Sequence, residues 1–157
     1  MTTTQSAKTI TLTLPDGSTR EYPAGTTGRD VALSIGKRLA ADALAIKVNG
    51  QVRDLARPID SDGAIQILTW DSPDGKQVFW HSSAHVMAQA VQEVLPGTKV
   101  AIGPPIEEGF YYDFDPPRPF TPDDLEKFEK RMAEIAAEDS PFVRHECSPQ
   151  EARDLFE

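Results

Sequence analysis

The run Thr9-Ile10-Thr11-Leu12-Thr13-Leu14, followed directly by Pro15-Asp16-Gly17-Ser18, decides the fold of the first part of the chain. Its polar and apolar residues alternate, which predicts a strand with one buried face. The Pro-Asp-Gly segment predicts a tight turn, because proline presets φ and glycine accepts a positive φ. A second strand at about 19–22 would close a hairpin.

Further helix and strand patterns follow the hairpin within about 70 residues. Thr26 or Thr27 is a suitable N-cap for a helix with an apolar face that includes Val31, Ala32, Ile35 and Leu39. Strands are predicted at 45–48, 51–54 and 64–69, and Asn49-Gly50 is a strong hairpin turn between the first two. This order, β-β-α-β-β-β, predicts one helix across a small mixed sheet. We therefore expect a ubiquitin-like β-grasp domain of the α+β class over residues 1–70.

Charge and composition change near residue 70. Residues 1–70 carry a net charge of +1 and residues 71–157 a net charge of −10, within a total of −9. The polar segment 71–75, which contains Pro73 and Gly75, is predicted to be a linker. The acidic second part argues against unspecific binding of nucleic acid, which requires cations against phosphates.

Composition also limits the class of protein. The single cysteine, Cys147, excludes an internal disulfide framework and is typical of a reducing compartment. No apolar run is long enough for a transmembrane helix, and the first residues lack the features of a secretory signal. We therefore expect a cytoplasmic protein without a membrane partner.

Residues 76–157 are predicted to form the first part of a second α+β domain. The patterns indicate helices at about 78–95, from Thr121 and from Ser148, with strands at 99–102, 109–114 and 141–147. The last helix pattern is about nine residues long and has no C-cap signal, and isolated helices of that length are marginal. We therefore expect this domain to be incomplete within the 157 residues.

The segment His81-Ser82-Ser83-Ala84-His85 places two histidines four residues apart, one above the other on a helix. A metalloprotease would need Glu after the first His, so that chemistry is not supported. A zinc site of His81 and His85 with His145 and Cys147 is conceivable, because the latter two would share a strand face. The favoured alternative makes Cys147 a small hydrophobe and His145 a solvated residue. The helical pair itself is as consistent with local hydrogen bonding as with a functional site.

Several runs resemble a known family. Pro15-Asp16-Gly17-Ser18, Asp30-Val31-Ala32 and Val48-Asn49-Gly50 resemble the TGS domain, a β-grasp module. The His81–His85 segment looks like the HSxAH motif in the editing domain of bacterial threonyl-tRNA synthetases. The run from Ala101 to Asp113, with sequence AIGPPIEEGFYYD, resembles the most characteristic stretch of that same domain.

The resemblance implies that the chain is the N-terminal segment of a synthetase that joins threonine to tRNA(Thr) with ATP and hydrolyses mischarged seryl-tRNA(Thr). His81 and His85 would contact the tRNA terminal ribose and position the attacking water. Gly103 and Tyr112 would line the pocket for the seryl group. The partners would be tRNA(Thr), threonine and ATP, and the full enzyme would form a homodimer through its catalytic core.

The resemblance also implies what these residues lack. The partner motif Cys-x-x-x-His is absent from the 157 residues, and so is the core that would hold ATP with magnesium and a zinc ion. We therefore expect no cofactor in this segment, and neither aminoacylation nor efficient editing by the segment alone. Two alternatives are a free-standing deacylase that edits in trans and a TGS-bearing regulatory or ribosome-associated module.

Overall fold

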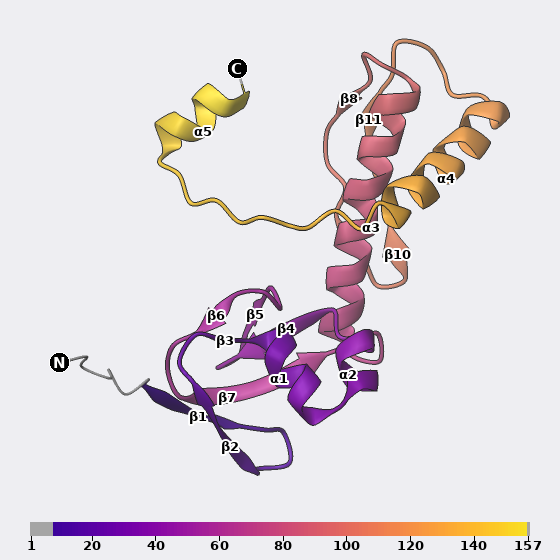
Figure 1. Cartoon of the computed structure of the whole chain (residues 1–157). Helices are drawn as coiled ribbons and strands as arrows, with labels where there is room; N and C mark the ends of the chain where they lie inside the picture. The colour runs from indigo at the N-terminus through magenta and orange to yellow at the C-terminus, as the bar shows by residue number, and fades with distance from the viewer. Residues whose placement is uncertain (1–7, 157) are drawn as a thin grey trace. The chain divides into compact units, whose positions relative to one another are not determined.

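The structure is a computed structural model that describes residues 8–156 (Figure 1). Its contacts divide the chain into two units. The first unit holds the chain up to His85 together with Val100–Asp115, and the second holds Val86–Lys99 together with the chain from Pro116. Each unit is described by itself below.

Five strands of the first unit form one mixed sheet in the order β2-β1-β7-β4-β5 (Figure 1). The β1–β7 pair is parallel, and the other three neighbouring pairs are antiparallel. The predicted β-grasp fold, with one helical layer on a small mixed sheet, is therefore confirmed. The strands are β1 (Thr9–Thr13), β2 (Thr19–Pro23), β4 (Ala45–Val48), β5 (Gln51–Arg53) and β7 (Gly63–Leu68).

Two short helices, α1 (Gly28–Ile35) and α2 (Lys37–Asp42), follow the hairpin. Thr27 caps α1: its hydroxyl accepts from the Asp30 backbone N–H at 3.2 Å, and the Asp30 carboxylate accepts from the Thr27 N–H at 3.0 Å. The predicted single helix through Leu39 is wrong, because the backbone is extended at Gly36 and separates the two helices.

The core of the β-grasp domain lies between α1 and the sheet. Fully burying one large aliphatic side chain stabilises a fold by about 1.5–3 kcal/mol. The apolar residues that alternate along β1 are buried, so each contributes directly to the stability of the domain. The turn after β4 also follows the sequence, because Asn49 and Gly50 both have the positive φ that a type I′ turn requires. The buried core residues are Ile10, Leu12, Val31, Ile46, Val48, Ile59 and Ile65.

A further strand pair closes the edge of this domain. β3 (Thr26–Thr27) and β6 (Pro58–Ile59) are antiparallel and form their own two-stranded sheet. Ile59 lies outside the strands predicted from the sequence, yet its side chain is 2% exposed and belongs to the core. The pair is short and its strands lie far apart in sequence, so periodicity alone does not reveal it.

Helix α3 (Pro73–Val94) begins five residues before its predicted start at Val78. Ser72 acts as its N-cap: the Ser72 hydroxyl accepts from the Gly75 N–H at 3.1 Å, and the Ser72 carbonyl accepts from the Lys76 N–H at 2.9 Å. Proline is favoured in the first turn that follows such a cap. Residues 73–75 of the predicted linker therefore belong to the helix.

The first turn of α3 lies against the end of β7. A Cβ on Gly75 would lie 1.9 Å from the Thr69 carbonyl oxygen, which no side chain can tolerate. The Ser72 N–H donates to that same carbonyl at 3.1 Å, and Lys47 on β4 forms an ion pair with Asp74. These contacts attach the helix directly to the sheet.

Four short strands follow α3, and all their residues except Lys99 belong to the first unit. β9 and β10 form a tight hairpin, and β8 pairs with β11. The continuous aromatic strand predicted at 109–114 is wrong, because the backbone leaves strand geometry between Phe110 and Phe114. Two backbone hydrogen bonds, Ala101 to Asp113 and Asp113 to Ile102, still hold the two segments together. The strands are β8 (Lys99–Val100), β9 (Pro105–Ile106), β10 (Gly109–Phe110) and β11 (Phe114–Asp115).

The second unit contains α4 (Pro122–Ala137) and α5 (Pro149–Phe156). Both helices begin where the sequence predicts them. Thr121 and Asp124 form a capping box at the start of α4, and Arg118 makes two hydrogen bonds to the Asp124 carboxylate, at 2.6 and 3.0 Å. The predicted strand at 141–147 is wrong: the segment has no regular structure, and all its side chains are exposed.

The Gly75 contact predicts a specific stability change. Gly75→Ala should lower the free energy of unfolding of the first unit by about 1–3 kcal/mol, because an added methyl group in a packed site forces the backbone apart. The measurement is hydrogen exchange of the β7 amides in the 157-residue chain. Gly36→Ala is the matched control, because no atom lies within 4 Å of an added Cβ there and the backbone is extended. Equal effects of the two substitutions would contradict the contact.

The Arg118–Asp124 pair predicts a titration. The Arg118 guanidinium, followed by the Thr121 backbone N–H and hydroxyl, holds the pKa of Asp124 well below its ordinary value of 3.8. Because the folded-state pKa is depressed, the carboxylate stabilises α4 above pH 3.8, and this contribution is lost as the pH falls through the folded-state pKa. NMR titration of the Asp124 carboxyl checks this. Arg118→Gln should raise that pKa, and an unchanged value in the variant would disprove the proposed cause.

Candidate functional site

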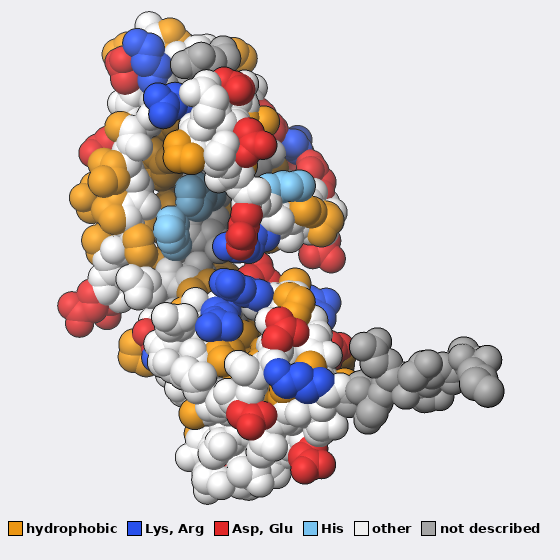
Figure 2. All heavy atoms as spheres, turned by 90° about the vertical axis from the view of Figure 1, so that its left-hand side faces the viewer, with side chains coloured by type: hydrophobic (Ala, Val, Ile, Leu, Met, Phe, Trp, Pro, Cys, Tyr) orange, Lys and Arg blue, Asp and Glu red, His pale blue; other side chains and the backbone are white. Residues whose placement is uncertain are grey.

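Helix α3 presents the two histidines on its exposed side. The imidazole rings of His81 and His85 stack with their centroids 4.9 Å apart and their planes 26° from parallel. Ala84 and Ala88 are buried and hold another side of the helix in the protein interior. The i, i+4 spacing therefore creates a pair of adjacent imidazoles that is accessible from solvent. Histidine side chains (pale blue) reach the surface in Figure 2.

The structure also brings together the other two predicted site residues. The Tyr112 ring lies over the backbone of Gly103, so that a Cβ at residue 103 would lie 2.1 Å from Tyr112 Cδ2. Tyr112 is half-buried and stacks on Phe114 with ring centroids 4.8 Å apart. The neighbouring Tyr111 is 50% exposed. The absence of a side chain at Gly103 is thus what permits this position of the Tyr112 ring.

The two candidate zinc ligands outside the helix lie in the second unit. His145 and Cys147 are both exposed and do not lie on a strand, so the shared strand face inferred from their spacing does not exist. The solvated His145 of the favoured alternative agrees with its exposed side chain, and Cys147, which that alternative makes a small hydrophobe, is exposed as well. Within residues 8–156, no group of three or more His, Cys, Asp or Glu side chains is arranged to hold a metal ion.

An aromatic cluster beside the histidines was missed by the sequence analysis. The Trp80 ring contacts Trp70 at 5.3 Å, Phe79 at 5.6 Å and Phe110 at 6.1 Å between centroids. The Lys76 ammonium lies 5.6 Å from the Trp70 ring centroid. The only local signal was the pair Phe79-Trp80 directly before His81; the contacts with Trp70 and Phe110 depend on the fold.

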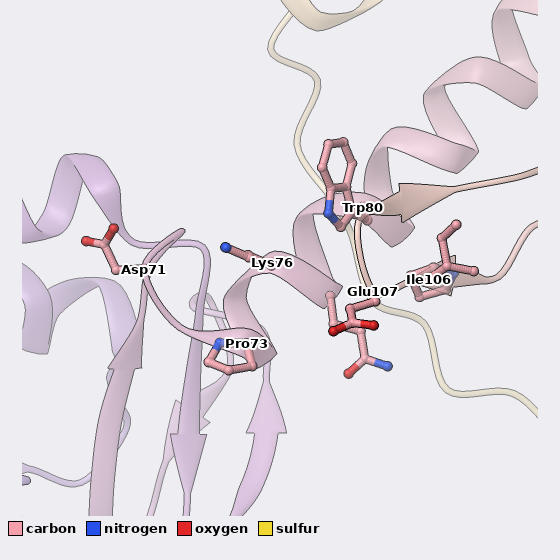
Figure 3. A pocket seen from close by; sticks show the side chains of 8 residues that line it. Asp71, Pro73, Lys76, Trp80, Ile106 and Glu107 are labelled. Atoms are coloured by element: carbon pink, nitrogen blue, oxygen red, sulfur yellow. The ribbon is translucent and has the colours of Figure 1, made fainter.

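Trp80 forms part of the wall of a pocket of about 510 Å³ in the first unit (Figure 3). One wall is the first two turns of α3, and the other is the β9–β10 hairpin. Both apolar and polar side chains line these walls, a composition that suits a small polar ligand with a flat apolar part. The lining residues are Asp71, Pro73, Lys76, Gln77, Trp80, Pro105, Ile106 and Glu107.

Sequence comparisons connect this geometry to known proteins. Residues 10–69 match the TGS domain family. The chain is 53% identical over 147 residues to a threonine--tRNA ligase of Pelodictyon phaeoclathratiforme, which covers 94% of this chain and 22% of the relative. It is 53% identical over 150 residues to a threonine--tRNA ligase of Rhizobium etli, covering 96% of this chain and 22% of the relative. It is 50% identical over 147 residues to that of Symbiobacterium thermophilum, covering 94% and 23%.

These matches extend across both units, whereas the TGS match covers only the β-grasp domain. The chain spans about a fifth of the length of these relatives. In the described part of the chain, no helix combines the length and apolar character needed to cross a membrane. The chain thus carries a TGS domain at residues 10–69, and over nearly its whole length it is similar in sequence to about a fifth of each of these threonine--tRNA ligases.

Proposed function

We propose that this chain serves within a threonine--tRNA ligase that attaches threonine to tRNA(Thr) with ATP. The observation that carries the proposal is the identity of about half of all residues to enzymes of that name over nearly the whole chain. The partners would be tRNA(Thr), threonine and ATP. The protein would act in the cytoplasm, as a homodimer formed through a catalytic core outside these residues, where ATP with magnesium and a zinc ion would bind.

The role of this segment would be hydrolysis of tRNA that carries serine by mistake. Serine lacks one methyl group of threonine, and one such group changes binding in a pocket by only about 1–3 kcal/mol. That difference is too small for accurate translation, so a second site that hydrolyses the wrong ester is needed. The exposed histidine pair on α3 has the chemistry for such a site.

Each predicted site residue has a role that its geometry supports. The stacked imidazoles of His81 and His85 can hydrogen-bond ribose hydroxyls and a water molecule. That water would attack the ester carbonyl, and the ribose oxygen would leave with a proton. Tyr112, held over Gly103, would form a wall for the amino acid side chain. General acid–base catalysis by positioned imidazole contributes about 10²–10⁴-fold to such reactions.

We further propose that the 157 residues alone do not perform this hydrolysis efficiently. They contain the histidine pair but no Cys-x-x-x-His sequence, which the resemblance assigns to the other half of the site. The free-standing deacylase and the regulatory TGS module are not favoured, because the matched relatives are named as ligases and match across both units.

His81→Ala in the full-length enzyme should slow hydrolysis of seryl-tRNA(Thr) by about 10²-fold or more, because one catalytic imidazole is removed. Threonine charging should be unchanged, and serine mischarging should rise. Single-turnover deacylation and charging assays measure these rates. Ser82→Ala, at the adjacent exposed position, should leave both rates as they are. Proofreading that survives His81→Ala at the wild-type rate would remove the catalytic role.

Gly103→Ala should displace the Tyr112 ring, because the new methyl group would overlap ring carbon atoms. Aromatic proton shifts of Tyr112 in the 157-residue chain report the displacement directly. In the full-length enzyme, seryl-tRNA hydrolysis should fall while threonine charging persists. Tyr111→Phe is the control, because Tyr111 is exposed and retains its ring. A displaced Tyr112 ring with normal proofreading would exclude this wall from the pocket.

A further inference from the structure

The pocket between the start of α3 and the β9–β10 hairpin has no role in the function proposed above. Its volume of about 510 Å³ lies within the range typical of small-molecule sites. Lys76 and Trp80 line the pocket from the helix, and Ile106 and Glu107 line it from the hairpin (Figure 3). All of its lining residues belong to the first unit.

Trp80 provides an apolar surface whose orientation is fixed before any ligand binds. Its ring is half-buried and is contacted by the rings of Trp70, Phe79 and Phe110. A ring held in this way loses little side-chain entropy when a ligand stacks on it. Stacking of a nucleic-acid base on an aromatic side chain contributes about 1–3 kcal/mol and accepts any base.

The polar groups of the pocket are chemically suited to one class of base. Across residues 8–156, neither the carboxylates of Asp71 and Glu107 nor the amide of Gln77 has a protein hydrogen-bond partner. A carboxylate accepts hydrogen bonds only, so it suits the amino group of cytosine or adenine. Uracil carries a carbonyl oxygen in place of the cytosine amino group, and that oxygen would repel the carboxylate.

The pocket and the histidines lie on the same helix, with Gln77 and Trp80 of the pocket wall one turn before His81 and His85. Gln77, His81 and His85 are spaced four residues apart, so they form one row on α3 with a rise of about 6 Å between neighbours. Lys76, whose ammonium lies 5.6 Å from the Trp70 ring centroid, supplies a cation in the pocket wall that can attract the phosphate of a nucleotide chain. A strand whose last ribose lies at His81 and His85 therefore reaches the pocket with its preceding nucleotide.

We infer that this pocket binds an amino-bearing base, the cytosine that precedes the terminal adenosine of an RNA 3′ end, by stacking on Trp80 and hydrogen bonding to Glu107. The inference rests on the proposed function, because that function places the terminal ribose at the histidines. Asp71 provides a second acceptor at the opposite end of the pocket, and the β9–β10 hairpin excludes water from one side of the base.

The test compares two trinucleotides of equal charge, CCA and CUA, that differ only in the middle base. Titrated into the 157-residue chain, CCA should bind at least fivefold more tightly than CUA and should shift the Trp80 indole N–H signal. Glu107→Gln should reduce the preference to less than twofold, because an amide can donate as well as accept. Glu108→Gln, an exposed carboxylate next to the pocket, should keep the preference.

Equal affinities for CCA and CUA, no binding of CCA at millimolar concentration, or the same effect from both glutamate variants would overturn the inference. Far-UV circular dichroism of each variant establishes that it is folded. Failure of the proposed function gives a different result: His81→Ala would leave proofreading intact in the full-length enzyme while the CCA preference persisted.

Discussion

The contact between Gly75 and the Thr69 carbonyl determines where helix α3 begins. A Cβ atom on residue 75 would lie 1.9 Å from the carbonyl oxygen, so only the hydrogen of glycine fits there. The first turn of α3 can therefore lie directly on the end of β7, and the Ser72 cap and the Lys47–Asp74 ion pair then add to a contact already made. A larger residue would separate helix and sheet and loosen all three interactions together.

The site residues depend on this attachment because they lie one to three turns further along the same helix. Trp80 is fixed by rings from the helix, from the end of β7 and from β10. His81 and His85 follow on the exposed side. The β-grasp domain therefore holds the N-terminal end of α3 in place. The position of that end sets the direction in which the two histidines point.

Local signals in the sequence predicted most of the elements, and long-range contacts account for the errors. Asn49-Gly50 and the Thr121-Pro122-Asp123 helix start depend only on their own residues, so they were predicted correctly. The segment Ser72-Pro73-Asp74 has the same helix-start pattern, but Gly75 made it resemble a linker. The strand pair of β3 and β6 and the irregular segment 141–147 were misread because a strand requires a partner strand that periodicity does not identify.

The same distinction holds for the candidate site. The stacking of His81 on His85 follows from helix geometry alone, whereas the Trp80 pocket requires a hairpin some 25 residues away, closed by residues that carry no motif. Gly103 and Tyr112 were connected to the site only through the resemblance to a known family, and the structure supplies the steric reason for the glycine.

The position of β7 in the sheet has a consequence for synthesis on the ribosome. This last strand of the domain lies between β1 and β4, and its parallel pairing with β1 joins Leu12 to Gly63. The first hairpin can form early, but the central hydrogen bonds cannot form until residue 68 has left the exit tunnel. Bringing β1 and β7 together closes the long loop between them, which costs conformational entropy before their hydrogen bonds contribute any stabilisation. This cost slows folding. The β-grasp domain should therefore fold in one late step, when α3 begins to leave the ribosomal exit tunnel.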